Sequence, residues 1–421
     1  MLQWDELHPY SAVHIVQVRG ALAAARLRTC IERTVEERGL THLTLDRGRG
    51  TYRYEGGPAD CEIRTIAGAA GPRGALMAEL ERQLNLRFDC TRPFSPFRFL
   101  VAAAEDSFFL GLVYFHPAAD AASVVGLLQD IVTGYVAHGT GGRPGDLDLY
   151  PDSRAHLLCR HPMVVVRKLL ALPAQVRRLR QSHRAPRADA EDMANGFVCF
   201  TLGPADLRAL VAAAKAWAVT VNDLLLALLL KALAPCAAER TQARRRRELS
   251  VGCIVNLRRD LGVDSRRTFG LFLGSFTVTH AVPEGISLRA LAADLQRQTA
   301  PIKRQRLYLA TPLELGLARW LLRCFSPGRR RRFYAKNHPL WGGITNLNLN
   351  DLWEPSATPA PLDYFRGVST GPVTPLVLSV TTIADRVNLG LSYRTSVFSR
   401  ADIERLAGRF RDHFEATRRD L

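Results

Sequence analysis

Hydrophobic and polar residues alternate, or recur at helical spacing, in segments that follow one another along both halves of the chain. In the first half, the pattern predicts strands at 13–18, 97–102 and 107–115, a hairpin at 43–54, and helices at 21–38, 75–86 and 123–137. In the second half, it predicts strands at 197–202, 249–256, 275–280, 343–349, 377–383 and 386–393, and helices at 203–218, 220–233 and 400–417. The chain is therefore predicted to form two α/β lobes of similar size, each with α+β layers.

The segment 154–187 separates the two halves and has a different composition. It contains many Arg residues and no Asp or Glu, and its apolar residues fall at roughly helical intervals. We interpret it as a basic connecting helix. The predicted organisation is an N-terminal lobe at 1–153, a basic connector at 154–190 and a C-terminal lobe at 191–421.

Charge and composition narrow the functional classes. The 421 residues include 57 Lys and Arg against 40 Asp and Glu, for a formal net charge of +17. A basic surface attracts polyanions. Nucleic acid is not the expected partner, because the sequence has no Gly-rich phosphate loop, zinc-ligand spacing or aromatic-interleaved RNA motif.

The sequence gives no sign of a metal site, a secretion signal or a membrane span. The eight cysteines form no CxxC pair, so we expect no metal centre and read them as small core residues in a reducing cytoplasm. The first twelve residues contain no apolar signal region, and polar residues interrupt the longest apolar run, 219–234. We therefore expect a cytoplasmic protein.

One histidine stands out as candidate chemistry. The apolar strand 108–115 ends at His116, and Asp120 follows after Pro117, Ala118 and Ala119. A neutral imidazole can take a proton from an attacking hydroxyl or amine near neutral pH. A His-Asp pair at this spacing is a weak signal alone, since many folded chains contain one without using it.

The surroundings of this pair resemble the HHxxxDG region of coenzyme-A-dependent acyltransferases. That superfamily includes chloramphenicol acetyltransferase, nonribosomal peptide condensation domains, alcohol acetyltransferases and polyketide-associated acyltransferases. Similar stretches follow in the family's order over nearly the whole chain, at 88–98, 108–121, 219–227, 255–259, 270–275, 344–347 and 389–398. Three positions depart from the family pattern: Phe115 replaces the first His, Ala121 the final Gly, and Gly274 an Asn.

The resemblance implies two chloramphenicol-acetyltransferase-like subdomains arranged as a V around a central tunnel. It also implies acyl transfer from a pantetheine thioester to a hydroxyl or amine, with His116 and Asp120 as the catalytic-motif residues. His116 is then the general base, and Asp120 is expected to pair with Arg258 as a structural contact. Candidates for binding substrate or the oxyanion are Thr345, Asn346, Ser379 and Thr381.

Partners and alternatives follow from the same resemblance. The donor would be acyl-CoA or an acyl or peptidyl carrier protein, so coenzyme A or phosphopantetheine enters as part of the substrate and no cofactor is permanently bound. The acceptor would be a small alcohol or amine. Phe115 and Ala121 leave open a catalytically silent, condensation-like module that binds a carrier or partner enzyme. The basic segments 154–187 and 323–336 fit a carrier protein, coenzyme A phosphates or peripheral contact with an anionic membrane, or a solvated face.

Overall fold

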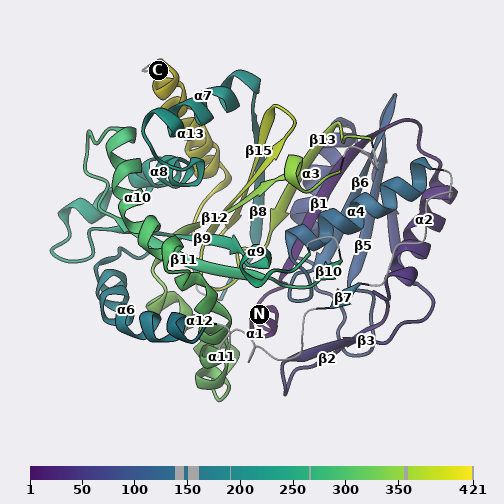
Figure 1. The fold of residues 1–421 in the computed structure, drawn as a ribbon, viewed down its shortest axis with the longest axis horizontal. Coiled ribbons are helices and arrows are strands. Elements are labelled where there is room, and N and C mark those ends of the chain that lie inside the picture. The colour runs from purple at the N-terminus through teal and green to yellow at the C-terminus, as the bar shows by residue number, and fades with distance from the viewer. Residues whose placement is uncertain (138–146, 150–160, 190, 265–266, 355–358, 420–421) are drawn as a thin grey trace.

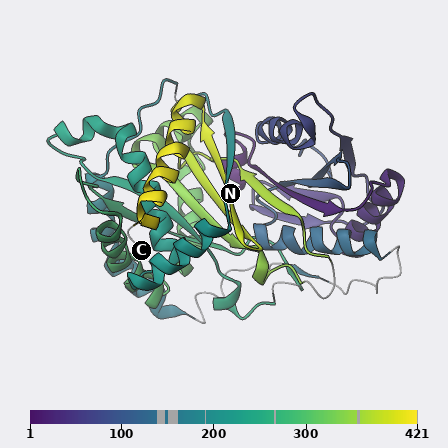
Figure 2. The same ribbon diagram turned by 90° about the horizontal axis from the view of Figure 1, so that it is seen from above.

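The computed structural model describes residues 1–137, 147–149, 161–189, 191–264, 267–354 and 359–419. Two large β-sheets, each with helices packed on it, form two lobes that lie side by side (Figure 1). Figure 2 shows the second lobe, with its C-terminal helix in yellow, beside the first lobe, whose long helix is blue. The predicted two-lobed α/β fold is confirmed.

The first lobe is built on a mixed five-stranded sheet. In spatial order its strands are β13 (Asp363–Val368), β1 (Ser11–Arg19), β6 (Ser107–Phe115), β5 (Phe97–Ala103) and β4 (Glu62–Thr65). All neighbours are antiparallel except β4 and β5. A hairpin of β2 (Leu43–Asp46) and β3 (Thr51–Tyr54) lies beside the sheet, where the sequence predicts one.

Side-chain alternation divides the first lobe into two apolar clusters. Even-numbered residues of β6, such as Leu110 and Leu112, pack with α2 (Ala24–Glu37) and α4 (Ala121–Val136). Odd-numbered residues pack on the other face with α3 (Gly71–Gln83). All nine residues of β6 are buried, as expected for a central strand covered on both faces.

The second lobe is built on a six-stranded sheet. In spatial order its strands are β11 (Leu273–His280), β9 (Leu249–Asn256), β12 (Leu340–Asn348), β14 (Leu376–Ile383), β15 (Arg386–Arg394) and β8 (Asn195–Leu202). A short parallel pair, β7 (Asp148–Leu149) with β10 (Thr268–Phe269), joins segments from the two halves of the chain.

Helix α8 (Val221–Leu233) forms the centre of the second core. Thr220 caps it, with Oγ1 accepting from the Asp223 amide at 3.2 Å. It packs against α7 (Pro204–Ala216), α10 (Leu288–Arg304) and α13 (Arg400–Arg419). With the following turn η1 (Ala234–Gln242), it is long and apolar enough to resemble a membrane span, but residues 223–230 are all buried in this core.

The remaining helices contribute few residues to these cores. Helices α6 (Pro162–Gln181), α11 (Thr311–Leu322) and α12 (Pro327–Asn337) gather at the lower left of Figure 1. The shorter elements are α1 (Leu2–Asp5), α9 (Arg258–Leu261), η2 (Leu307–Ala310) and η3 (Leu349–Asp351). The part of the predicted basic connector at 154–160 lies outside the described residues; the part that the structure describes contains α6.

One strand does not follow the predicted division of the chain. The sequence assigns 191–421 to the second lobe, but β13 pairs with β1 in the first sheet, with Ile15 opposite Phe365. The strand carries one hydrophobic face, including Tyr364, into the cluster beneath α2 and α4. The second edge of β1 is therefore paired, over residues 12–17, by chain from the second half, and this crossing places β13 at the contact between the lobes.

Candidate active site

His116 follows directly after β6 and is held by its own backbone turn. Its Nδ1 lies 2.9 Å from the carbonyl oxygen of Ala119, and its backbone amide donates to the Tyr10 carbonyl at 3.1 Å. A carbonyl can only accept, so Nδ1 carries the hydrogen and Nε2 keeps the lone pair. The turn thus fixes the tautomer in which Nε2 can accept a proton.

The surroundings of the imidazole favour its neutral form. Tyr10 stacks on the ring at 5.0 Å between centroids, and Tyr114 meets it edge-on at 5.6 Å. Burial lowers the pKa of His116 below the usual 6.5, and the Arg366 cation acts in the same direction, although Asp120 opposes it. The imidazole is therefore uncharged at neutral pH and available as a base.

Asp120 does not contact the imidazole in the described structure but joins the two lobes. Its Oδ2 accepts from Arg258 Nη1 at 2.5 Å and from the Phe272 amide at 3.0 Å, and its Oδ1 accepts from the Ser123 amide at 3.0 Å. Arg258 Nη2 also donates to Ser123 Oγ at 2.7 Å. The carboxylate caps α4 and accepts three hydrogen bonds. The predicted partner, Arg258, is thus the residue that contacts it.

A cavity of about 190 Å³ lies beside His116 at the contact between the lobes. The first lobe lines it with Tyr10, His14 and Tyr114, and the second with strands β9, β11 and β12. Apolar surface dominates the lining, and few polar groups interrupt it. A reacting group held here would meet the imidazole away from bulk water.

Arg366 of β13 supplies a buried positive charge to the same cavity. The residue is 5% exposed, and no carboxylate forms an ion pair with it in the described part of the chain. Its Nε donates to Thr381 Oγ1 at 3.0 Å, and its Nη2 donates to the carbonyls of Thr345 and Val380, each at 2.8 Å. Burial lowers its pKa to about 10, so it stays protonated near neutral pH.

The guanidinium retains donor capacity. Of its five N–H groups, three serve those acceptors and one of the two on Nη1 lies near Thr345 Oγ1 at 3.4 Å. Burying a cation without a counter-charge costs free energy. Arg366 is therefore a candidate for binding a negatively charged group in the cavity. The sequence analysis missed Arg366, because β13 is short and interrupts its apolar residues with charge.

The four predicted oxyanion candidates are distributed unequally. Thr345 lines the cavity, and Thr381 orients Arg366 without lining the cavity itself. Ser379 is buried on the same strand as Thr381, and its hydroxyl has no hydrogen-bond partner among the described residues. Asn346 is exposed and does not line the cavity, because successive residues of a strand point to opposite faces.

His14 is a second imidazole in the cavity wall that sequence reasoning missed. Its Nδ1 lies 2.6 Å from the Tyr364 hydroxyl, and the side chain is buried. Burial, together with the Arg366 charge, lowers its pKa well below 6.5. Its position within β1, a buried and mostly apolar strand, gave no local signal of chemistry.

The structure shows what surrounds two of the positions that depart from the family motif, Phe115 and Gly274. Phe115 points into the cluster beneath α3 and meets Phe94 edge-on at 5.6 Å between ring centroids, away from the cavity's imidazoles. Gly274 lines the cavity, where an added Cβ would lie 2.7 Å from the Tyr308 carbonyl oxygen. A side chain there would force the Tyr308 backbone or the Leu257 side chain to shift, which disfavours the Asn of the family pattern.

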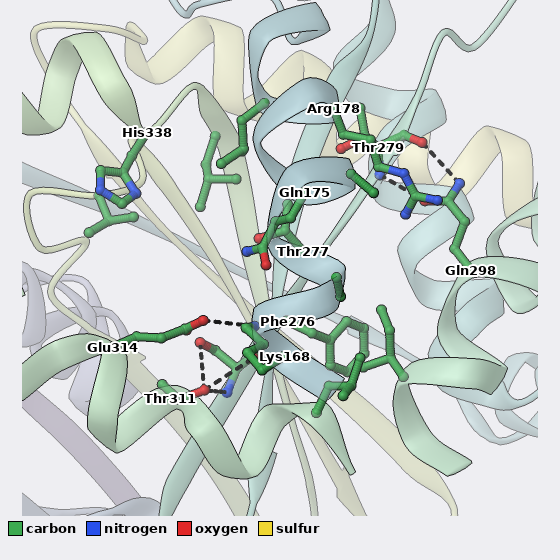
Figure 3. A pocket seen from close by; sticks show the side chains of 18 of the residues that line it. Lys168, Gln175, Arg178, Phe276, Thr277, Thr279, Gln298, Thr311, Glu314 and His338 are labelled. Atoms are coloured by element: carbon green, nitrogen blue, oxygen red, sulfur yellow. Dashed lines mark hydrogen bonds and ion pairs between the residues drawn. The ribbon is translucent and has the colours of Figure 1, made fainter. Parts of the chain in front are cut away.

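A larger chamber of about 470 Å³ adjoins this cavity. Both are lined by Ser275, Phe276 and Thr277 of β11 and by Thr311 and Leu315 of α11. The inner side of α6 closes the chamber, and Lys168 reaches Glu314 of α11 at 2.8 Å (Figure 3). Its lining is mostly apolar, and the candidate base lies only in the smaller cavity.

Comparisons with known proteins identify the fold. No protein family and no curated protein sequence matches the chain. The first condensation domain of the calcium-dependent antibiotic synthetase, solved with a substrate analogue, is 15% identical with a TM-score of 0.71, covering 99% of this chain and 93% of that one.

Two further structures extend the similarity. The condensation domain of the Monacolin K polyketide synthase is 12% identical with a TM-score of 0.67, covering 99% of this chain and 95% of that one. The X-domain from teicoplanin biosynthesis, solved in complex with OxyB, is 18% identical with a TM-score of 0.59, covering 98% and 89%. Identities this low establish the fold alone. From end to end, the chain shares the fold of these condensation domains and of this X-domain.

Proposed function

We propose that the chain transfers an acyl group from a pantetheine thioester to a hydroxyl or amine, forming an ester or amide. The donor is an acyl-CoA or an acyl carrier protein, and the setting is lipid, polyketide or peptide natural-product biosynthesis in the cytoplasm. One observation carries the proposal: the Ala119 carbonyl holds the proton of His116 on Nδ1, so that Nε2 is a neutral base beside a cavity between the lobes.

The reaction follows from that tautomer. His116 Nε2 removes the proton from the acceptor hydroxyl or amine as its oxygen or nitrogen attacks the thioester carbonyl carbon. The resulting tetrahedral intermediate carries an oxyanion. Its collapse breaks the carbon–sulfur bond, and the departing thiolate takes the proton from the imidazolium. The products are the acylated acceptor and a free thiol, and His116 returns to its starting state.

Arg366 is our candidate for stabilising the oxyanion. Its charge lies in the same cavity wall as His116, and its bonds to Thr345, Thr381 and Val380 hold the guanidinium in place before any substrate arrives. A fixed donor beside a developing negative charge lowers the barrier without reorganisation. Thr345 Oγ1 is the second candidate donor, since it lines the same cavity.

Asp120 has a structural role in this proposal. Its carboxylate oxygens accept from Arg258 and backbone amides and do not contact the His116 imidazole. It stabilises the turn that carries His116 by capping α4 and by fixing the second lobe against it. Asp120 is thus a positioning residue, although it belongs to the same short motif as the proposed base.

A binding module without catalysis is the second candidate. The X-domain of similar fold was solved in complex with OxyB, and so this fold also serves in protein recognition. Phe115, which replaces the first His of the motif with a core side chain, favours this alternative. Such a module would bind a carrier protein or partner enzyme and release no thiol.

Thiol release separates the two candidates. The purified chain is incubated with acyl-CoA or acyl-loaded carrier protein and a panel of alcohols and amines, and free thiol is followed with time. The proposal expects acceptor-dependent release that His116→Ala abolishes. Release that survives His116→Ala contradicts the assigned base, whereas a wild-type chain that retains a carrier protein but releases nothing supports the binding module.

A further inference from the structure

The apolar side chains that the structure leaves exposed are concentrated in one region. Of the thirteen large exposed hydrophobic residues in the described part of the chain, ten lie on α6, on α11 or directly after α11. Scattered single residues of this kind are normal on protein surfaces, but a concentrated group indicates a contact site. The most exposed are Leu170 at 76%, Leu169 at 63% and Trp320 at 59%.

Helix α6 has an inner side of mixed polarity and an apolar outer side. Its inner side, with Ala171 and Gln175, lines the large chamber. The outer side presents Met163, Val166 and Leu170, which recur at three- and four-residue intervals and so form one stripe. The core does not require this stripe, because another part of the helix already makes the inward contacts.

Helix α11 repeats the arrangement on the other side of the chamber. Leu315 and Ala318 line the chamber, while Leu317, Trp320 and Leu321 are exposed at i, i+3 and i+4. The bond from Lys168 to Glu314 ties the two helices together (Figure 3). The exposed stripes therefore belong to the two helices that flank the chamber.

The charge around these stripes indicates the kind of partner. The twenty residues of α6 contain five basic residues and no acidic one, and Arg177 and Arg180 are exposed near its C-terminal end. A helix with an apolar stripe flanked by arginines is typical of helices that lie in a lipid–water interface. Trp320 on α11 belongs to a residue type that is enriched at membrane–water interfaces. A second copy of this chain would instead bring two basic helices together.

We infer that the outer faces of α6 and α11 dock on an anionic lipid bilayer. The exposed Leu and Trp side chains enter the acyl-chain boundary, and Arg177 and Arg180 contact headgroup phosphates. Docking in this way places the chamber next to the lipid, because the same two helices form the chamber wall. The inference is independent of the reaction at His116.

Vesicle sedimentation tests the inference with the full chain. Vesicles of pure phosphatidylcholine are compared with vesicles of three parts phosphatidylcholine and one part phosphatidylglycerol. We expect at least tenfold tighter binding to the anionic vesicles, and weaker binding at high salt. No sedimentation with the anionic vesicles would overturn the inference.

Two variants distinguish the apolar stripe from a purely electrostatic attraction. Leu169→Gln/Leu170→Gln removes apolar surface without changing the net charge, and it should weaken vesicle binding at least tenfold with an unchanged melting temperature. The matched control is Val211→Gln, which introduces the same side chain at a residue of α7 that is 50% exposed, and it should bind like wild type. Equal loss of binding in both variants would contradict the role of the stripe. A wild-type dimer that does not bind vesicles and becomes monomeric in the double variant would also contradict it. Binding of an acidic carrier protein in preference to vesicles would contradict it as well.

Discussion

Arg258 donates to Asp120 across 2.5 Å, and both side chains are almost completely buried where the two lobes meet. The pair links a residue that caps α4 to the short helix α9, more than a hundred residues later in the chain. Because the turn that carries His116 ends at Asp120, the same contact fixes the imidazole relative to the second lobe. The geometry of the candidate site therefore depends on an ion pair that is outside the cavity.

Removing the carboxylate should reduce stability as well as rate. Asp120→Ala leaves the Arg258 charge buried without its partner, so we expect the free energy of unfolding to fall by about 3–5 kcal/mol. Urea unfolding measures the loss. Glu32→Ala, which removes the exposed partner of Arg28, is the control and should cost less than about 1 kcal/mol. If Asp120→Ala abolished activity with an unchanged melting temperature, the structural role would be wrong.

The pH dependence of the rate should report His116. Burial lowers its pKa below 6.5, and the neutral form is the base. As pH falls through that lowered pKa the imidazole becomes protonated, so kcat/KM should decrease on the acid side and level off by about pH 7. The profile is measured with an acceptor alcohol, which does not titrate in this range. A rate that still rises between pH 7 and 8 would contradict the assignment.

Loss of the buried cation should affect the chemical step. Arg366→Gln removes the charge, and we expect kcat to fall about 10²- to 10³-fold, as when an oxyanion donor is lost, with a smaller change in KM. Arg366→Lys retains charge but not the guanidinium bonds to Thr345 and Val380, and should recover part of the rate. A change confined to KM would instead indicate that Arg366 binds an anionic group of the substrate.

Gly274 tests how closely the cavity wall is packed. A Cβ there would lie 2.7 Å from both the Tyr308 carbonyl oxygen and the Leu257 side chain. We expect Gly274→Ala to lower the free energy of unfolding by about 1–3 kcal/mol. Gly316→Ala is the matched control, because it lies within α11 with nothing near the added methyl group, and it should be neutral or stabilising. Equal stability of the two variants would mean that the residues around Gly274 can move to accommodate a methyl group.

The sequence pattern was sufficient for several elements with strong periodicity, although the amphipathic helix α10 was missed. Strand β9 and helix α8 match their predicted ranges closely, because alternation or an N-cap marks their ends. Strand β13 was missed, since Asp363 and Arg366 interrupt its apolar face and it pairs with a strand from the far end of the chain. Local patterns carry no information about that pairing.

The candidate site divides in the same way. His116 and Asp120 were recognisable in one stretch of sequence, with the help of the family resemblance. Arg366 and His14 join the cavity only through sheet pairing, and nothing near them in sequence marks them. Thr345 and Asn346 show why the strand pattern alone does not identify cavity residues. Neighbouring strand positions face opposite sides, and the orientation of the sheet decides which one lines the cavity.

The central claim is that His116 drives transfer of an acyl group to an acceptor, and product formation tests it most directly. Acylated acceptor is quantified by mass spectrometry after reaction of an acyl-pantetheine thioester with wild-type, His116→Ala and Phe115→His chains of verified stability. We expect product from wild type and from Phe115→His, and at least a 10²-fold lower yield from His116→Ala. Equal yields from wild type and His116→Ala would contradict the account.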